Sequence, residues 1–173
     1  FFNRFAGISG TLLIGAMAAA LVLSLLTLQA VIGGEEVHFE RHKWLVVDGA
    51  AIEFALLIDP LTALMLVVVT AVSLMVQIYS LGYMKGDPSY ARYFAYMALF
   101  TASMLGLILS ANIIVLYAFW ELVGVSSYLL IGFWHERPAA AAAAKKAFLI
   151  TRIGDVGLLL AILYLFFQGD RFA

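Results

Sequence analysis

The sequence contains no cysteine, and only 12% of its 173 residues are charged. Without thiols, the chain can form no disulfide, ligate no iron–sulfur cluster through cysteine and use no thiol nucleophile. The formal net charge is −1, which gives no indication of a basic surface for nucleic acid or of a charged, disordered tail. A water-soluble domain of this length would need far more polar surface. The scarcity of charge therefore argues against an ordinary soluble enzyme.

What the chain has in abundance is apolar residues, which make up 65% of it and give a mean hydropathy of +1.03. A helix needs about 20 such residues to cross roughly 30 Å of hydrocarbon. We therefore expect an all-α, polytopic membrane protein with about five transmembrane helices. The first lies within residues 1–34, and a four-helix unit over 60–168 holds the others, at about 60–83, 93–109, 113–133 and 145–167.

The N-terminal apolar stretch raises the alternative of a secretory signal peptide. Residues 5–34 carry no charge, and this run is longer than the apolar region of a signal peptide, which has about 7–15 residues. We interpret it as a membrane span. Because the sequence opens on Phe1 rather than methionine, we expect the chain to be a fragment of a longer subunit.

An acidic connection, residues 35–59, separates the first two spans and contains six acidic residues against two lysine or arginine residues. Two short segments within it, 42–48 and 51–56, could pair as a hairpin with a turn at Asp48-Gly49. At its end, Asp59 is placed to cap the helix that Pro60 opens, since proline at the first helical position loses no hydrogen bond. We expect Asp59 to be a cap rather than a functional acid.

Residues 93–134 contain one full charge, Glu121, over 42 positions. A single helix of this length would be about 63 Å long, roughly twice the hydrocarbon thickness. Two spans with a turn at 110–112 fit better, because Ser-Ala-Asn is the turn-like sequence near the midpoint. The last span is expected to begin near Lys145, after an alanine-rich, helix-favouring lead-in at 139–144.

The distribution of lysine and arginine predicts the orientation. With the N-terminus inside, six cations fall on the inner side: Arg4, Lys85, Arg92, Arg137, Lys145 and Lys146. Three fall outside with the acidic connection, namely Arg41, Lys43 and Arg171. The connection 35–59 is therefore predicted to be extracytoplasmic.

Glu121 is predicted to lie near the middle of its span, where an ionised carboxylate is costly unless it is paired or hydrated. Tyr117, Gly124 and Tyr128 share its helical face at i−4, i+3 and i+7, so phenols and space for water adjoin it. Intramembrane acids commonly mark ion or proton paths. The structural alternative is a protonated glutamic acid that donates one interhelical hydrogen bond.

The last span carries a second charged cluster. Arg152 and Asp155 are three residues apart, so they could neutralise each other and either lock helices together or bias the protonation of Glu121. Lys146, at the inner boundary, is a candidate for proton input, although snorkelling to lipid head groups would also explain it. Trp120 is expected to make a lipid or packing contact. We find no motif for a metal, phosphate or cofactor, which leaves proton handling as the available chemistry.

Several sequence segments occur together in an order typical of one family. They are Asp59-Pro60-Leu61-Thr62, Tyr90-Ala91-Arg92-Tyr93-Phe94-Ala95-Tyr96, Phe119-Trp120-Glu121-Leu122-Val123-Gly124, Ser127-Tyr128-Leu129-Leu130-Ile131-Gly132-Phe133-Trp134, Lys146-Ala147-Phe148 and Thr151-Arg152-Ile153-Gly154-Asp155. Over about 59–163 the chain closely resembles the N-terminal part of the large antiporter-like subunit of respiratory complex I, known as subunit L or chain 5 of NADH-quinone oxidoreductase.

The resemblance implies a fold and a set of roles. Such subunits contain inverted repeats of five helices and a line of buried charges, and they lie at the distal end of the membrane arm. The family's central channel glutamate maps onto Glu121, and the acid of its Arg-Ile-Gly-Asp motif maps onto Asp155, beside Arg152. The family pairs the glutamate with a lysine two spans later, and the printed chain ends at Ala173, before that helix. The chain alone is therefore not expected to complete a channel.

The function implied is proton translocation, coupled electrostatically to quinone reduction elsewhere in the complex. NADH, FMN, iron–sulfur clusters and quinone are then expected in partner subunits, with no cofactor in this chain. The expected partners are other membrane-arm subunits, especially a neighbouring antiporter-like one, and the location is an energy-transducing membrane, most simply a bacterial inner membrane. Two alternatives stay open: the large subunit of a multi-subunit sodium/proton antiporter, and a membrane scaffold that has lost transport.

Overall fold

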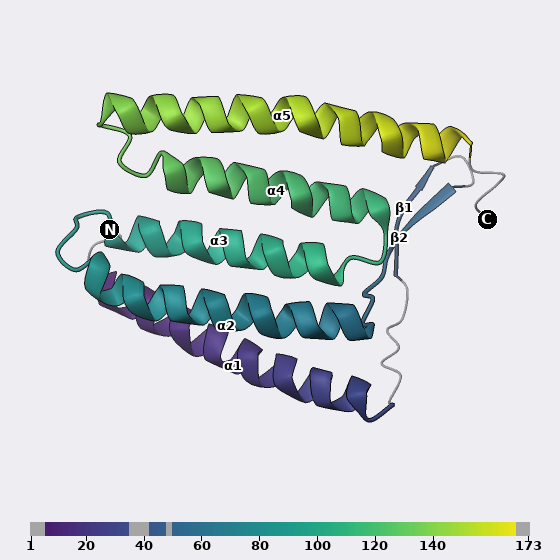
Figure 1. Ribbon diagram of the computed structural model, residues 1–173, viewed down its shortest axis with the longest axis horizontal. Coiled ribbons are helices and arrows are strands. Elements are labelled where there is room, and N and C mark those ends of the chain that lie inside the picture. The colour runs from purple at the N-terminus through teal and green to yellow at the C-terminus, as the bar shows by residue number, and fades with distance from the viewer. Residues whose placement is uncertain (1–5, 35–41, 48–49, 169–173) are drawn as a thin grey trace.

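The computed structural model describes residues 6–34, 42–47 and 50–168, and five long helices account for most of them (Figure 1). Their bounds are α1 Ala6–Ile32, α2 Pro60–Tyr83, α3 Tyr90–Leu109, α4 Ile113–Ile131 and α5 Pro138–Phe167. Each is long and apolar enough to cross a bilayer. The prediction of an all-α, polytopic membrane protein with five spans is confirmed.

The helices run nearly parallel to one another in a row, with α1 packed on α2 at one edge and α5 at the other (Figure 1). Successive helices are antiparallel, so the α2–α3 and α4–α5 connections share one end of the bundle. The α3–α4 turn and the short strands lie at the opposite end. Along the row, α3 packs on α4, and α4 packs on α5.

Three helix ends differ from the predicted ones. The α5 helix begins at Pro138 instead of near Lys145, because the alanine run is itself helical and proline fits the first helical position. The α3 helix begins at Tyr90, three residues earlier than expected. The α4 helix ends at Ile131 and is capped by Gly132, two residues earlier than expected.

Side-chain caps fix where two helices begin. Asp59 accepts a hydrogen bond from the backbone N–H of Thr62 at 2.6 Å. This bond holds the pKa of the Asp59 carboxyl below its ordinary value of 3.8, so the cap stays ionised at neutral pH. Asn112 accepts from the N–H of Ile114 at 2.8 Å and opens α4 where the turn was predicted. Asp59 is the predicted cap.

A two-stranded hairpin precedes α2. Strand β1, His42–Val47, pairs antiparallel with β2, Ala50–Phe54, in the predicted arrangement; the predicted turn at 48–49 lies outside the described residues. The segment after β2 then joins the bundle, because the N–H of Leu57 donates to the carbonyl of Leu109 at 3.0 Å and that of Ala111 donates to Ala55 at 3.1 Å. The connection is thereby attached to the α3–α4 turn.

Candidate functional site

The neighbouring helices α4 and α5 bring together the three charged residues that the sequence places at membrane depth. Arg152 of α5 forms an ion pair with Glu121 of α4 through Nη1 and Oε2. The same Nη1 lies 4.0 Å from Oδ2 of Asp155, one helical turn along α5. The predicted Arg152–Asp155 pair is therefore present, and its arginine also binds Glu121. One guanidinium is shared by two carboxyl groups.

The side chains of the cluster are largely buried. The side-chain exposed fractions are 19% for Glu121, 11% for Asp155 and 31% for Arg152. Two carboxylates and one guanidinium would leave an excess negative charge at a depth where charge is costly. A bound proton, or another cation, would balance it. The site therefore has the composition of a proton-binding site.

Tyr117 completes the coordination of Glu121. Its hydroxyl, one turn earlier on α4, donates to Oε1 of Glu121 at 2.6 Å. The sequence places this phenol on the same helical face, and the structure shows the contact. The two carboxyl oxygens of Glu121 thus have different partners: Oε1 accepts a hydrogen bond from Tyr117, and Oε2 forms the ion pair with Arg152. A donor to a carboxylate stabilises its ionised form.

Trp120 is a site residue that the sequence interpretation missed. Its indole N–H donates to Oδ1 of Asp155 at 2.9 Å, which makes it a ligand of the cluster as well as a packing residue. A signal was available, because a tryptophan N–H deep in a membrane needs an acceptor. Trp120 and Glu121 together give α4 two consecutive contacts to the charged residues of α5.

Aromatic rings adjoin the arginine. The Arg152 guanidinium carbon lies 4.7 Å from the centroid of the Phe148 ring, a cation–π distance. The Phe148 ring also contacts Tyr128, with centroids 5.2 Å apart. Gly124, the remaining residue on the Glu121 face, has open space where a side chain would project. Beyond Glu121, this face of α4 therefore has open space at Gly124 and the phenol of Tyr128, which contacts the Phe148 ring of α5.

Lys146 lies apart from the cluster. It is exposed, and its Cα lies about 9 Å before that of Arg152 along the α5 axis. Within residues 6–34, 42–47 and 50–168 it has no ion pair. The structure thus brings Glu121, Arg152 and Asp155 together and leaves Lys146 outside.

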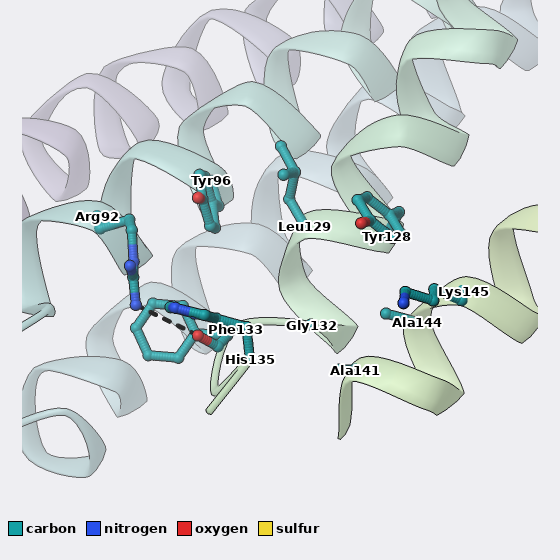
Figure 2. Close-up of a pocket in the computed structure, with 10 residues that line it drawn as sticks. All are labelled: Arg92, Tyr96, Tyr128, Leu129, Gly132, Phe133, His135, Ala141, Ala144 and Lys145. Carbon is teal, nitrogen blue, oxygen red and sulfur yellow. Dashed lines mark hydrogen bonds between the residues drawn. The ribbon is translucent and has the colours of Figure 1, made fainter. Parts of the chain in front are cut away.

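A pocket of about 360 Å³ opens where α3 begins, α4 ends and α5 begins. Its lining includes Arg92, Tyr96, Tyr128, His135 and Lys145 (Figure 2). Arg92 donates to the backbone carbonyl of Phe133 at 3.3 Å. Tyr128 links this pocket to the Glu121 face, because it lines the pocket and lies two turns from Glu121 on α4.

Among the residues that the structure describes, no group of three histidine, aspartate or glutamate side chains is arranged to hold a metal ion. The charged cluster offers two carboxyl groups, each of which can bind a proton, beside one guanidinium.

Two protein-family models match the chain. Residues 44–94 match the family described as NADH-ubiquinone oxidoreductase (complex I), chain 5 N-terminus. Residues 110–171, which contain the whole charged cluster, match NADH:quinone oxidoreductase/Mrp antiporter, TM. The chain belongs to the chain 5 family of these oxidoreductases.

Curated chain 5 proteins are close in sequence. NAD(P)H-quinone oxidoreductase subunit 5 of Zygnema circumcarinatum, a chloroplast protein, is 51% identical over 158 residues, which are 91% of this chain and 22% of that protein. NAD(P)H-quinone oxidoreductase chain 5 of Synechocystis is 47% identical over 170 residues, 98% of this chain and 25% of that protein. The chain therefore spans about a quarter of the length of these chain 5 relatives.

A solved structure shares the fold. It is that of the membrane-bound sulfane sulfur reductase, an archaeal respiratory membrane complex, one chain of which matches with a TM-score of 0.74 at 19% identity. The match covers 91% of this chain and 33% of the other. At this identity the likeness shows that the helix arrangement of the chain 5 family also occurs in another membrane-bound complex.

Proposed function

We propose that the chain is part of a proton-translocating, antiporter-like subunit of an NAD(P)H-quinone oxidoreductase, and that Glu121 is its proton-carrying group. One observation carries the proposal: the Glu121 carboxyl shares the guanidinium of Arg152 with Asp155 between two transmembrane helices. Family membership supports it, since the chain 5 relatives are named as subunits of such oxidoreductases.

The proposed mechanism is electrostatic. When Arg152 lies against Glu121, the carboxylate is stabilised and releases its proton. When Arg152 moves toward Asp155, Glu121 loses this stabilisation and takes up a proton. In the low effective dielectric of a membrane interior, a unit charge that moves a few ångströms changes the proton affinity of a neighbouring acid by orders of magnitude. Charge movements elsewhere in the complex would drive the shift.

Proton uptake is proposed to use the pocket at the α4–α5 end of the bundle. The pocket contains Tyr128, which lies on the Glu121 face, and Gly124 leaves room between the two residues. Water in this space would connect the pocket to the carboxyl group. Lys145 lines the pocket, and its neighbour Lys146 retains the proposed role in proton input at the same membrane boundary.

The partners and cofactors follow from the same proposal. NADH, FMN, iron–sulfur clusters and quinone would be bound by other subunits, and a neighbouring antiporter-like subunit would contact this one. The chain would hold no redox centre and would lie in an energy-transducing membrane. A bacterial inner membrane is the proposed location.

The second candidate function is sodium/proton antiport by a multi-subunit antiporter. It is favoured by the description of the family model over 110–171, which names Mrp antiporters as well as oxidoreductases. The match of 44–94 to a chain 5 model favours the oxidoreductase. Co-purification discriminates between them, since flavin and iron–sulfur subunits would accompany an oxidoreductase and only small membrane subunits an antiporter.

The substitution Glu121→Gln tests the proposal. It keeps the shape of the side chain but removes its ability to gain and lose a proton. In inverted membrane vesicles that contain the assembled complex, we expect proton translocation to fall by at least about tenfold. The matched control is Glu136→Gln, at an exposed position between α4 and α5, which should leave translocation unchanged. Normal translocation by an assembled Glu121→Gln complex would show that Glu121 is structural.

A further inference from the structure

A separate polar feature lies on α2, remote in sequence from the charged cluster. Gln77 is fully buried, with 0% of its surface exposed. Neither its amide nitrogen nor its amide oxygen has a hydrogen-bond partner among the residues that the structure describes. A buried primary amide can form several hydrogen bonds, and such groups are nearly always satisfied in native proteins. Gln77 therefore requires a ligand that reaches the interior of the bundle.

The surroundings of Gln77 are polar on both sides along α2. Ser73 and Ser80, at i−4 and i+3, share its helical face. Each forms a hydroxyl pair with α3: Thr101 Oγ1 lies 3.3 Å from Ser73 Oγ, and Ser80 Oγ lies 3.1 Å from the Tyr93 hydroxyl. Gln77 thus occupies the level between two hydroxyl pairs that join α2 to α3.

The α3 helix offers no strong partner at that level. On α3, Met97 lies midway between Tyr93 and Thr101 on the same helical face, and it is buried and apolar. The backbone carbonyl of Met97 already accepts from Thr101 at 2.9 Å. The amide of Gln77 is therefore left between polar groups that it does not contact directly.

The two hydroxyl pairs retain the capacity to bind something small. The Ser80 hydroxyl donates to the carbonyl of Val76 at 2.7 Å, so Tyr93 is the donor in their pair and Ser80 keeps a free acceptor position. Thr101 has one hydroxyl proton and donates it at the shorter distance to the Met97 carbonyl, 2.9 Å against 3.3 Å to Ser73 Oγ, so Ser73 retains hydrogen-bonding capacity of its own. A ligand between them must both donate and accept, as the Gln77 amide also requires. Water is the molecule of that size and chemistry.

We propose that Gln77 binds ordered water at the α2–α3 interface, with one molecule bridging its amide to Ser73 and another bridging it to Ser80. The result is one hydrogen-bonded chain from Thr101 through Gln77 to Tyr93. It stabilises the contact between α2 and α3 by satisfying the amide inside the membrane. All five side chains belong to α2 and α3, so this water site is independent of the charged cluster on α4 and α5.

The direct test is a cryo-electron microscopy map of the complete complex at a resolution that shows ordered water. We expect a density peak within about 3.2 Å of the Gln77 amide, next to Ser73 or Ser80. The peak should vanish in Gln77→Met, which has similar volume and no amide. It should persist in Gln29→Met, a control at an exposed position on α1. A map that shows other ordered waters and no peak at the wild-type amide would overturn the proposal.

A double-mutant cycle provides a second measurement on the assembled complex. If water links Gln77 to Ser80, the changes in unfolding temperature caused by Gln77→Met and Ser80→Ala should be strongly non-additive, since either change removes the same bridge. The Gln29→Met and Ser80→Ala changes should be additive. Additive effects in the Gln77 cycle would contradict a bridge.

Discussion

At the residue scale, the arrangement of Glu121, Arg152 and Asp155 shows how a carboxyl group is accommodated between two transmembrane helices, and it is the basis for the proposal that Glu121 exchanges a proton. A glutamate and an arginine in a simple pair would neutralise each other and could remain locked. A second acid gives the arginine another position. In the proposed mechanism, the competition between two carboxyl groups for one guanidinium would make the proton affinity of Glu121 adjustable.

The Tyr117 hydrogen bond provides a graded test of this competition. Tyr117→Phe removes one donor from the Glu121 carboxylate and leaves Arg152 in place. A hydrogen bond to a charged group contributes about 1.5–3 kcal/mol, so we expect the pH profile of proton translocation to shift and its rate to fall severalfold. Tyr79→Phe, at an exposed position on α2, is the control. Identical pH profiles for the two variants would contradict a role for Tyr117 in setting the charge of Glu121.

Part of this site was predictable from the sequence. Glu121 stands out because it is the one full charge in a long apolar stretch, and the i, i+3 spacing of Arg152 and Asp155 indicates a pair. The contact between Glu121 and Arg152 was not predictable, because it depends on how α4 and α5 are rotated against each other. The hydrogen bond from Trp120 was missed for the same reason.

At the scale of the helices, close packing of α3 on α4 depends on Gly106. A side-chain carbon at this position would overlap the ring of Phe119, the residue next to Trp120. Gly124, also on α4, has open space in the same position. The two glycines therefore differ in what a methyl group would meet, although both lie in transmembrane helices.

Alanine substitutions at these glycines form a matched pair. Gly106→Ala should destabilise the assembled complex by about 1–3 kcal/mol, because the helices must separate or Phe119 must leave its position. Gly124→Ala should have little effect on stability. Thermal unfolding of the complex, followed by native gel electrophoresis after heating, measures both. Equal stability of the two variants would contradict the observed α3–α4 packing.

Most helix positions were predictable because the length of an apolar run and the cap residues are local features. Pro60 and Asn112 identify the starts of α2 and α4 directly. The predicted start of α5, near Lys145, was too late, because Lys145 and Lys146 were taken to mark both the membrane boundary and the start of the helix. A helix can begin outside the membrane. Helix propensity continues through the alanines to Pro138.

At the scale of the whole molecule, the five antiparallel spans give the two ends of the bundle different numbers of lysine and arginine residues. The α2–α3 and α4–α5 connections share one end with Lys85 and Arg137, and the α3–α4 turn lies at the other with Ala111. The excess of lysine and arginine predicts that the first end faces the inner side.

The absence of cysteine makes this topology easy to measure. Lys85 and Arg137 are exposed. A single cysteine in the variant Lys85→Cys or Arg137→Cys should react with a membrane-impermeant maleimide from the inner side only. A cysteine at Ala111, also exposed, should react from the outer side only. Labelling of Lys85→Cys and Ala111→Cys from the same side would contradict the arrangement of α3 as a membrane span.

The chain spans about a quarter of the length of its chain 5 relatives, and its outer helices carry large exposed apolar residues, among them Ile153 at 76% and Phe167 at 83%. Such surfaces suit lipid or further transmembrane helices.

Which helices pack against which could not be predicted from hydropathy, because lipid and protein present equally apolar surroundings to a helix face.

The protonation of Glu121 during turnover can be observed by infrared difference spectroscopy of the complete complex in membranes. Our account predicts a carboxylic acid C=O band that appears and disappears as the enzyme is driven by substrate, that shifts in deuterium oxide, and that is lost in Glu121→Gln but retained in Glu136→Gln. The same band with unchanged amplitude in an assembled, turning-over Glu121→Gln complex would contradict the central claim that this carboxyl group carries the proton.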